Sequence, residues 1–407
     1  SCSGYMTKKL QRNLTLYPWY AGLFHAYFWL PVYFLFFQSK LDLPDVLILE
    51  SIYFTSVVAL EVPSGWFSDM FGRRRTLIVA SCFLCGSYVL FLLANSFNMF
   101  AFAQVLLAAG IAFNSGTDTS FLLESTQALD MENEYGEREA AATRCNFLGT
   151  AAAGILGGLA SIPDYRGAYV LSLIGAVGLL IITLCFTEPL KENTTSKPLK
   201  IGLFKQIHAC IALLRNIRLL WLSAFAVFML VMNHIPYEFY QPYIEEIARK
   251  YDVIKATPFL TSLHLAFTML VAAWIASKSI RIRDRIGVGA TLISASCLQL
   301  GMIIVMHFFV NIPAAIATLL RSCPRALMTA PLNAAVAPNV PTSKRATFLS
   351  LQSLFGRLGF ASTLAFFAYI ANGEDWASIA TMLQWSMWAG IIGVLLLIIT
   401  SIAVREG

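Results

Sequence analysis

Long apolar runs separated by short polar connections make up most of the chain. A transmembrane helix needs about 20 mostly apolar residues, and twelve runs meet that requirement. Their approximate ranges are 16–38, 44–67, 76–95, 99–125, 140–160, 168–187, 219–241, 257–279, 286–309, 312–336, 346–371 and 376–404. Charged residues are sparse within these runs, and none of the runs contains more than three. The pattern therefore predicts an all-α membrane protein with twelve transmembrane helices.

The twelve runs form an internal repeat. Spans 7 to 12 begin 203 to 213 residues after spans 1 to 6, in the same order. An even number of spans gives both halves the same insertion direction, as in transporters built from two parallel six-helix repeats. We therefore expect an N-terminal bundle at 6–187 and a C-terminal bundle at 219–407. Residues 1–5 precede Met6, and we interpret them as an expression scar.

A polar connection at 188–218 is the longest between the two halves. Its second part, 203–214, carries apolar residues at helical spacing. This spacing is typical of an amphipathic helix lying on the cytoplasmic surface. The alternative interpretation is a simple extension of the seventh span.

Charge is scarce in this chain, and its distribution gives an orientation. Hydrophobic residues make up 57% and charged residues 13% of 407 residues, about half the charge of a soluble protein. This composition argues against a soluble enzyme, a nucleic-acid binder and a disordered chain. With the N-terminus inside, 21 of 29 Lys and Arg fall on the inner side and five outside. By the positive-inside rule both termini are cytoplasmic, in a bacterial inner (plasma) membrane.

The connection between spans 2 and 3 carries a specific motif. Residues 65–75 read GWFSDMFGRRR, which resembles the G-x-x-x-D-x-x-G-R-[RK] signature of the major facilitator superfamily. The resemblance implies a secondary transporter that rocks two six-helix halves about a central site. Gly65 would allow close helix approach, Asp69 would pair with Arg73 or Arg74 at a helix end, and Gly72 would permit the tight turn.

Other segments resemble drug-exporter-like, proton-antiporting facilitators. Residues 113–125 resemble their Ser- and Gly-rich fourth helix, 61–65 their E-x-P-x-G, and 344–350 their opening of span 11. Gln104 stands where those antiporters carry an Arg. In span 5, Ala153 and Gly154 replace their Gly-Pro pair, with Gly157 and Gly158 following. The glycines of this span are expected to let helices pack tightly during gating.

Four acidic residues within the spans of the first half are of functional interest. A charge at the bilayer centre is costly, so such residues usually face a cavity or a partner. We predict Asp118 first and Glu50 second as the proton carriers. Glu61 and Glu124 lie near cytoplasmic helix ends, where they are expected to serve as gating partners of residues 73–75.

Basic residues within the spans lie in the second half. Arg321 and Arg325 are four apart on span 10 and are expected to share one helix face. Arg357 lies in span 11 and His264 in span 8. These residues could bind an anionic substrate through planar guanidinium groups. The alternative is bonding between helices, and both readings stay open.

Spans 1 and 7 are rich in aromatic and polar residues. His25 and Tyr27 are mid-span and are candidates for proton or substrate binding, with a packing histidine as the alternative. His234 and Glu238 form a similar pair in span 7. Tyr at membrane ends usually lies in an interfacial belt, which is the expectation for Tyr17, Tyr20, Tyr33 and Tyr243. Pro236 and Pro242 are expected to break span 7 near its outer end.

The predicted function is transport without enzymatic chemistry. The chain has no P-loop and no clustered metal ligands, so we expect no cofactor and no metal. The sequence predicts a proton-coupled transporter of a small amphipathic organic solute, with export favoured. The alternatives are transport of an anionic solute, such as a carboxylate metabolite or a siderophore, and a lipid-moving or receptor-like protein without proton coupling. The expected partners are the solute, protons and membrane lipids, with no nucleic acid, and the protein is expected to be monomeric.

Overall fold

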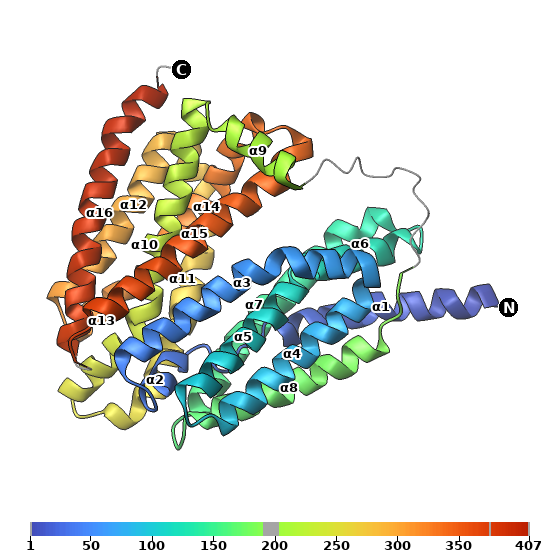
Figure 1. Cartoon of the computed structure of the whole chain (residues 1–407), viewed down its shortest axis with the longest axis horizontal. Coiled ribbons are helices and arrows are strands. Elements are labelled where there is room, and N and C mark those ends of the chain that lie inside the picture. The colour runs from blue at the N-terminus through green and yellow to red at the C-terminus, as the bar shows by residue number, and fades with distance from the viewer. Residues whose placement is uncertain (1, 190–202, 374–375, 406–407) are drawn as a thin grey trace. The chain divides into compact units, whose positions relative to one another are not determined.

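The structure is a computed structural model that describes residues 2–189, 203–373 and 376–405. All regular secondary structure within these ranges is helical (Figure 1). The chain divides into two compact units. The first comprises Ser1–Lys197 with Pro258–Leu263, and the second comprises Pro198–Thr257 with His264–Gly407.

The first unit packs its helices around a core of aromatic side chains. Its elements are α1 (Cys2–Phe24), α2 (Tyr33–Gln38), α3 (Leu43–Phe71), α4 (Arg73–Leu93), α5 (Phe97–Asn114), α6 (Thr117–Gln127), η1 (Glu132–Glu134), α7 (Tyr135–Ala160) and α8 (Arg166–Cys185). Helix α4 packs against α5 and α8, and α1 packs against α7 and α8. Phe36, Phe91, Phe100 and Tyr169 are fully buried and in mutual ring contact. These rings hold α2, α4, α5 and α8 together.

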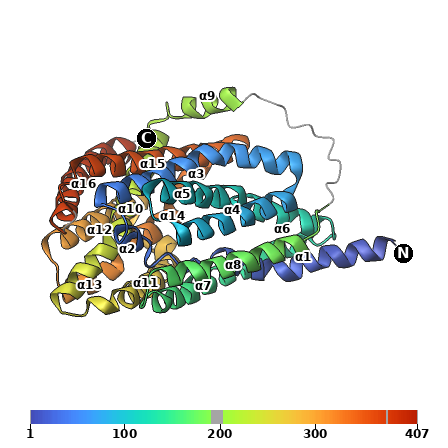
Figure 2. The same ribbon diagram turned by 60° about the horizontal axis from the view of Figure 1, so that its bottom comes forward.

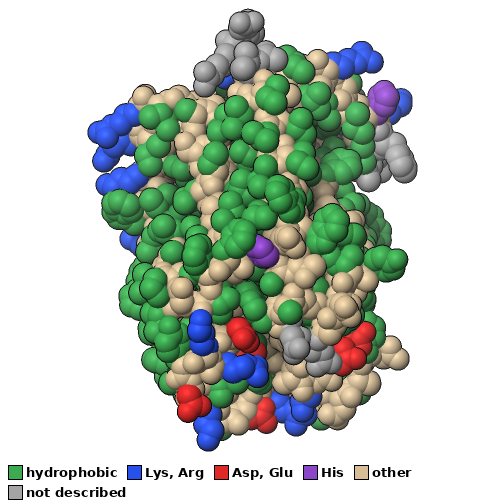
Figure 3. Space-filling view, turned by 90° about the vertical axis from the view of Figure 1, so that its left-hand side faces the viewer, with side chains coloured by type: hydrophobic (Ala, Val, Ile, Leu, Met, Phe, Trp, Pro, Cys, Tyr) green, Lys and Arg blue, Asp and Glu red, His purple; other side chains and the backbone are tan. Residues whose placement is uncertain are grey.

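The second unit has the corresponding set of helices. Its elements are α9 (Leu203–Leu213), α10 (Ile217–Lys250), η2 (Ile254–Ala256), α11 (Thr257–Ile286), α12 (Val288–Phe308), α13 (Ile312–Ala317), η3 (Thr318–Leu320), α14 (Cys323–Val336), η4 (Ala337–Asn339), α15 (Thr342–Ile370) and α16 (Trp376–Arg405). Within α11, the segment Pro258–Leu263 belongs to the first unit. Helix α10 packs against α15 and α16, and α12 packs against α14 and α16. On the face seen in Figure 3, hydrophobic side chains cover the middle and charged ones gather at the two ends. This is the distribution that a bilayer requires.

Nine helices in the described part of the chain are long and apolar enough to cross a membrane. The other three predicted spans, the first, fifth and tenth, are also helical. The first and tenth are interrupted. Span 1 divides into α1 and α2 around turns at residues 25–32, and span 10 divides into α13, η3 and α14. The apolar pattern did not predict these two interruptions.

The fourth span is interrupted as well. Helix α5 ends at Asn114, and α6 begins at Thr117 after Gly116, which has φ +73°. Glycine populates this left-handed region without the steric cost of a Cβ atom. Spans 4 and 10 are equivalent in the repeat, so one helix pair is interrupted in both units. Interrupted membrane helices leave backbone groups that a cavity or polar neighbours must satisfy.

Two sequence-based expectations about span 7 and the tyrosines were wrong. Helix α10 continues through both Pro236 and Pro242 to Lys250. The tyrosines expected at the membrane interface are instead in the protein interior; they are Tyr17, Tyr20, Tyr33 and Tyr243, all at most 5% exposed. The Tyr243 hydroxyl, for example, donates to the Phe309 carbonyl at 2.6 Å. Partners for their hydroxyls inside the bundle outweigh the interfacial preference.

Helix α9 is a separate element in the connection between the halves. It ends at Leu213, and Asn216 then caps the start of α10 by accepting from the backbone N–H groups of Arg218 and Leu219. Cys210 is buried and α9 packs against α15 (Figure 2). The alternative of a continuous extension of span 7 is therefore excluded. Residues 190–202 of the predicted connection lie outside the described residues.

Candidate functional site

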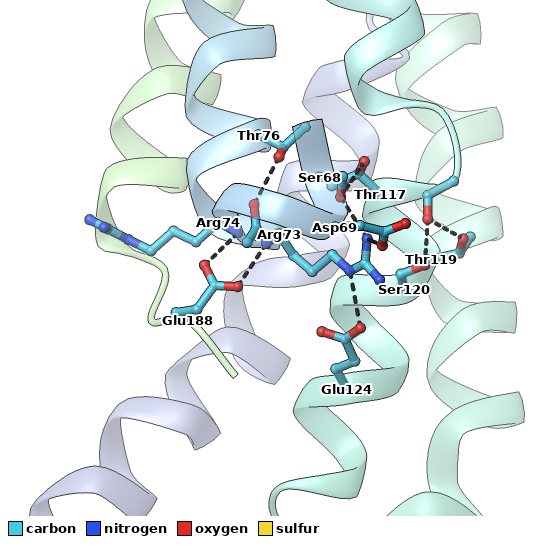
Figure 4. Close-up of polar contacts among 12 residues, drawn as sticks. Ser68, Asp69, Arg73, Arg74, Thr76, Thr117, Thr119, Ser120, Glu124 and Glu188 are labelled. Atoms are coloured by element: carbon cyan, nitrogen blue, oxygen red, sulfur yellow. Dashed lines mark hydrogen bonds and ion pairs between the residues drawn. The ribbon is translucent and has the colours of Figure 1, made fainter. Parts of the chain in front are cut away.

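The signature loop builds an ion-pair network at one end of the first unit. Arg73 opens α4, and its guanidinium contacts Asp69 on α3 at 2.9 Å and Glu124 on α6 at 3.0 Å. It also donates to the Ser68 hydroxyl at 2.7 Å (Figure 4). The Arg73 and Glu124 side chains are 14% and 19% exposed, so solvent screens their contact less than it screens a surface pair. Asp69 is 67% exposed, so its contact with Arg73 is more strongly screened. One guanidinium thus joins three helices, as predicted for Asp69, Arg73 and Glu124.

Glu188 is a member of this network that the sequence analysis missed. Its carboxylate accepts from the backbone N–H groups of Arg73 at 2.7 Å and Arg74 at 2.9 Å (Figure 4). It therefore caps the N-terminus of α4, where the helix dipole favours an anion. Burial raises the pKa of Glu188, although the two backbone donors lower it. The only signal in the sequence was an acid soon after span 6.

Gly72 is required both by its backbone conformation and by Glu188. Its φ is +95°, and a Cβ atom there would lie 2.6 Å from the Glu188 carboxylate. The signature glycine therefore makes room for the cap as well as for the turn. The preceding signature glycine behaves differently. Nothing lies within 4 Å of a Cβ placed at Gly65, so the predicted close helix approach there was wrong.

Asn13 on α1 binds the chain next to Glu188. Its amide donates to the Thr187 carbonyl at 2.8 Å and accepts from the Thr187 N–H at 2.8 Å. It also donates to the Ser125 hydroxyl at 3.2 Å. Asn13 is fully buried and binds the Thr187 backbone as a neighbouring strand would. Asn13 thus fixes the backbone of Thr187, the residue before Glu188, and is itself hydrogen-bonded to Ser125 on α6.

The glycines of span 5 allow close packing within the first unit. A Cβ at Gly157 would collide with the Phe28 carbonyl in the turns of span 1, and one at Gly158 would collide with Ser262. Ser262 belongs to the first unit by its contacts, and its hydroxyl donates to the Gly154 carbonyl at 2.6 Å. Glu61 is half-buried on α3, where its carbonyl accepts from Ser64.

The second unit contains a partial copy of the signature. Asp284 and Gly287 stand 215 residues after Asp69 and Gly72. Gly287 has φ +87° and ψ +161°, close to the +95° and +160° of Gly72, and it too precedes a 21-residue helix. Valine replaces Arg73 in this copy, and Asp284 pairs with Arg283 at 2.7 Å.

Asp118 lies in the first turn of α6, next to the interruption of span 4. Its carboxylate accepts from the Asn114 amide at 3.2 Å and from the Thr119 N–H at 2.8 Å. The Tyr20 hydroxyl donates to the same Asn114 side chain, and His25 is close enough to interact electrostatically with Asp118. The structure thus brings together two of the predicted proton-coupling residues. Asp118 remains partly exposed.

Glu50 has a different environment. It is 5% exposed on α3, and the Gln104 amide donates to it at 2.8 Å. Tyr27, which was grouped with His25, lies in the turns of span 1 and packs against Trp29.

The basic residues of the second unit fall into two places. Arg321 is 2% exposed and its guanidinium lies 4.0 Å from the centre of the Tyr240 ring, a cation–π geometry. The His264 ring stacks on the Tyr240 ring, with the ring centroids 5.8 Å apart. The His264 Nε2 atom is 3.1 Å from the Thr318 hydroxyl. Arg325 is exposed on α14. Because the helix is interrupted at Arg321, the two arginines do not share a face, and that prediction was wrong.

His234 lies near the second group of cations. It is half-buried on α10, and the charges of Arg325 and Arg357 act on it. Its Nδ1 is 2.7 Å from the Leu230 carbonyl. Glu238, one turn further along α10, is fully buried. Arg325 on α14 and Arg357 on α15 thus act on His234 electrostatically.

Comparison with known proteins identifies the family. The sequence profile of the Major Facilitator Superfamily matches residues 14–364. The chain belongs to this superfamily. No curated protein matches the chain in a sequence search. The family and the helical bundles confirm the predicted fold class and the general assignment as a multi-pass membrane transporter rather than an enzyme.

Solved structures of this superfamily share the fold at low sequence identity. The nucleoside transporter NupG matches with a TM-score of 0.75 and 11% identity, covering 96% of this chain and 98% of that one. The D-xylose-proton symporter matches with a TM-score of 0.69 and 14% identity, covering 95% and 96%. The peptide transporter POT in complex with sulfate matches with a TM-score of 0.67 and 14% identity, covering 97% and 95%. Identities this low establish the fold only.

Proposed function

We propose that this facilitator is a proton-coupled secondary transporter of a small organic solute, working by alternating access of its two halves. The observation that carries the proposal is the setting of Asp118. Its carboxylate sits at a helix interruption, is hydrogen-bonded to Asn114 and lies near His25. A titratable group in a membrane helix marks an ion or substrate pathway by default.

Asp118 suits proton transfer better than Glu50 does. A carrier must exchange its proton with water, and Asp118 is partly exposed whereas Glu50 is 5% exposed. Asp118 also has a neighbouring imidazole, His25, that can relay protons near neutral pH. Glu50 is hydrogen-bonded to a neutral amide, Gln104, an arrangement that suits a structural link between α3 and α5.

Proton coupling can be tested once a transported solute is known. A thermal-shift screen of metabolites and drugs on the purified protein would find one, because a ligand raises the melting temperature by mass action. In proteoliposomes, Asp118→Asn should abolish accumulation driven by a pH gradient but retain solute exchange, since exchange needs no net proton movement. Asp252→Asn is the matched control, because Asp252 is exposed and asparagine tolerates its φ of +58°.

Three outcomes of this assay bear on the proposal differently. Retained gradient-driven accumulation in Asp118→Asn, with loss in Glu50→Gln, would move the role to Glu50. Retention in both variants and in the double variant would end the proposal of proton coupling through these acids. A solute that binds the wild type but never crosses the membrane would favour the receptor-like alternative.

Export of an amphipathic solute is the direction that we propose. It is supported by the resemblance of residues 113–125 and 61–65 to drug-exporter segments. The direction of transport can be measured in membrane vesicles of opposite sidedness. With the proton gradient directed as in the cell, from the outer to the cytoplasmic face, uptake of the solute into inside-out vesicles with an acidic lumen indicates export coupled to proton antiport. Uptake into right-side-out vesicles with an acidic exterior indicates import coupled to proton symport.

A second candidate is transport of an anionic solute. The observation that favours it is the presence of two arginines within the spans of the second unit, Arg325 on α14 and Arg357 on α15. Charge-assisted hydrogen bonds to a guanidinium contribute about 1.5–3 kcal/mol each. Arg325→Gln should therefore weaken binding of a carboxylate solute roughly tenfold or more, and Arg249→Gln, at an exposed surface pair, should leave it unchanged. Equal affinities in all three proteins would exclude the anionic candidate.

A further inference from the structure

A cavity in the second unit lies where the first unit holds the Glu188 carboxylate. It has a volume of about 510 Å³ and is lined by the start of α10, the start of α12 and the end of α16. Its walls include Arg218 and Trp221 of α10, residues 286–290, and Ser401 of α16. A smaller cavity of about 330 Å³ shares Arg218 and Val288 with it and adds Arg283. Arg218 thus lines both.

The backbone has the same conformation at the start of α4 in the first unit and at the start of α12 in the second. Val288 and Gly289 are the repeat equivalents of Arg73 and Arg74, whose N–H groups bind Glu188 at 2.7 and 2.9 Å. Among the residues that the structure describes, no side chain accepts from the N–H groups of Val288 or Gly289, and nothing lies within 4 Å of a Cβ at Gly287 or Gly289. The same helix end therefore holds a carboxylate in the first unit and faces a cavity in the second.

The charges around this cavity favour an anion. Arg218 is exposed, and its guanidinium forms no ion pair with the described part of the chain. Lys278, Arg281 and Arg285 follow on the same end of α11, and Asp284 is the one acid there. Figure 3 shows Lys and Arg without Asp or Glu at the upper end of this face, whereas both signs mix at the lower end. The positive-inside rule explains the bases but not the cavity.

We propose that this cavity binds the phosphate of an anionic phospholipid headgroup. The phosphate takes the place that Glu188 occupies in the first unit, bound by the N–H groups of Val288 and Gly289 and by the Arg218 guanidinium. The apolar part of the wall, Trp221 and Ile286, suits the glycerol and first acyl carbons. The site lies at the predicted cytoplasmic ends of the spans, at the depth of the headgroups. A free phosphate ion shares the recognition chemistry but would not use the apolar wall.

Thermal unfolding of the purified, delipidated full-length protein tests the site. Phosphatidylglycerol in dodecyl maltoside micelles should raise the apparent melting temperature by roughly 5 °C at saturation, and phosphatidylcholine should not. Arg218→Gln should lose most of this shift. Arg215→Gln is the matched control, because Arg215 is exposed two residues before α10 but does not line either cavity.

A second variant separates loss of the site from poor folding. Ser401→Glu places a carboxylate in the cavity from α16, the repeat equivalent of the helix that precedes Glu188. It should raise the melting temperature without lipid and abolish the shift with phosphatidylglycerol. A full shift retained in both Arg218→Gln and Ser401→Glu overturns the site. A full shift from inorganic phosphate at matched ionic strength, with no further gain from the lipid, overturns the assignment to a lipid headgroup.

Discussion

At the scale of single residues, the signature loop is explained by what each side chain contacts. Gly72, Arg73 and Glu188 act together. Gly72 leaves space for the carboxylate, the N-terminus of α4 supplies two N–H donors, and Glu188 supplies the negative charge. The motif residues could be read from the sequence, since their spacing is specific. Glu188 could not, because it lies 115 residues from Arg73 and a short acidic connection has no distinguishing pattern.

Substitution of Gly72 should be more costly than substitution of its repeat counterpart. Gly72→Ala and Gly287→Ala both place a Cβ in a backbone conformation at positive φ and extended ψ that is essentially restricted to glycine, which costs about 1–3 kcal/mol. Only Gly72→Ala also meets a carboxylate, at 2.6 Å. We expect it to lower the apparent melting temperature by several degrees more than Gly287→Ala does. Equal losses would mean that Glu188 moves aside without cost.

Stability should depend on pH through Glu188. Burial raises its pKa above the ordinary value of 4.5, so the native state binds more protons than the unfolded state between these two values. The free energy of unfolding therefore falls as pH rises through that window, and Glu188→Gln removes this contribution. The melting temperature of the wild type minus that of Glu188→Gln should decrease from about pH 4.5 towards neutrality.

A suitable reference for this pH series is Glu132→Gln, which removes one exposed carboxylate near the same end of the unit. A difference between wild type and Glu188→Gln that stays constant over the whole range would contradict the assignment. In that case the carboxylate acts only through its two hydrogen bonds, which the amide can replace in part.

At the scale of elements, hydrophobic runs located the helices but not their interruptions. Spans 1, 4 and 10 read as continuous because apolar composition carries no information about backbone turns. Gly116 was visible in the sequence, yet glycine is common inside membrane helices. Pro236 and Pro242 predicted a break in span 7 that is absent, because α10 continues through both residues. Neighbouring helices can satisfy the backbone groups that a proline frees in a membrane.

The connection after α8 should depend on Asn13. Asn13→Ala leaves both the N–H and the carbonyl of Thr187 without their partner in a buried place, and each loss costs about 1–3 kcal/mol. We expect a large drop in the apparent melting temperature. Asn13→Asp keeps an acceptor for the Thr187 N–H but places a carboxylate against the Thr187 carbonyl in a fully buried site, so it should be at least as destabilising as Asn13→Ala. Asn95→Ala, at an exposed asparagine, is the control, and a similar loss there would refute the specific role.

At the scale of the whole molecule, the apolar runs and the internal repeat predicted two six-helix bundles. The resemblance of residues 65–75 to the superfamily signature indicated the family before any contact was known. The repeat also exposes what differs between the halves. The first unit holds acids within its spans and a complete signature network. The second holds arginines, a signature reduced to Asp284 and Gly287, and a cavity at the equivalent helix end. Which solute the two halves bind depends on side chains that no repeat or composition specifies.

Orientation is the last property that charge predicts, and it can be measured directly. With both termini cytoplasmic, Lys40 and Lys255 lie outside, whereas Lys205 and Arg281 lie inside; all four are exposed. In intact cells, a membrane-impermeant maleimide should label Lys40→Cys and Lys255→Cys above the wild-type background from native cysteines. It should label Lys205→Cys and Arg281→Cys only after the membrane is permeabilised. The reverse pattern would invert the topology, and with it the side from which both Asp118 and the Arg218 cavity are reached.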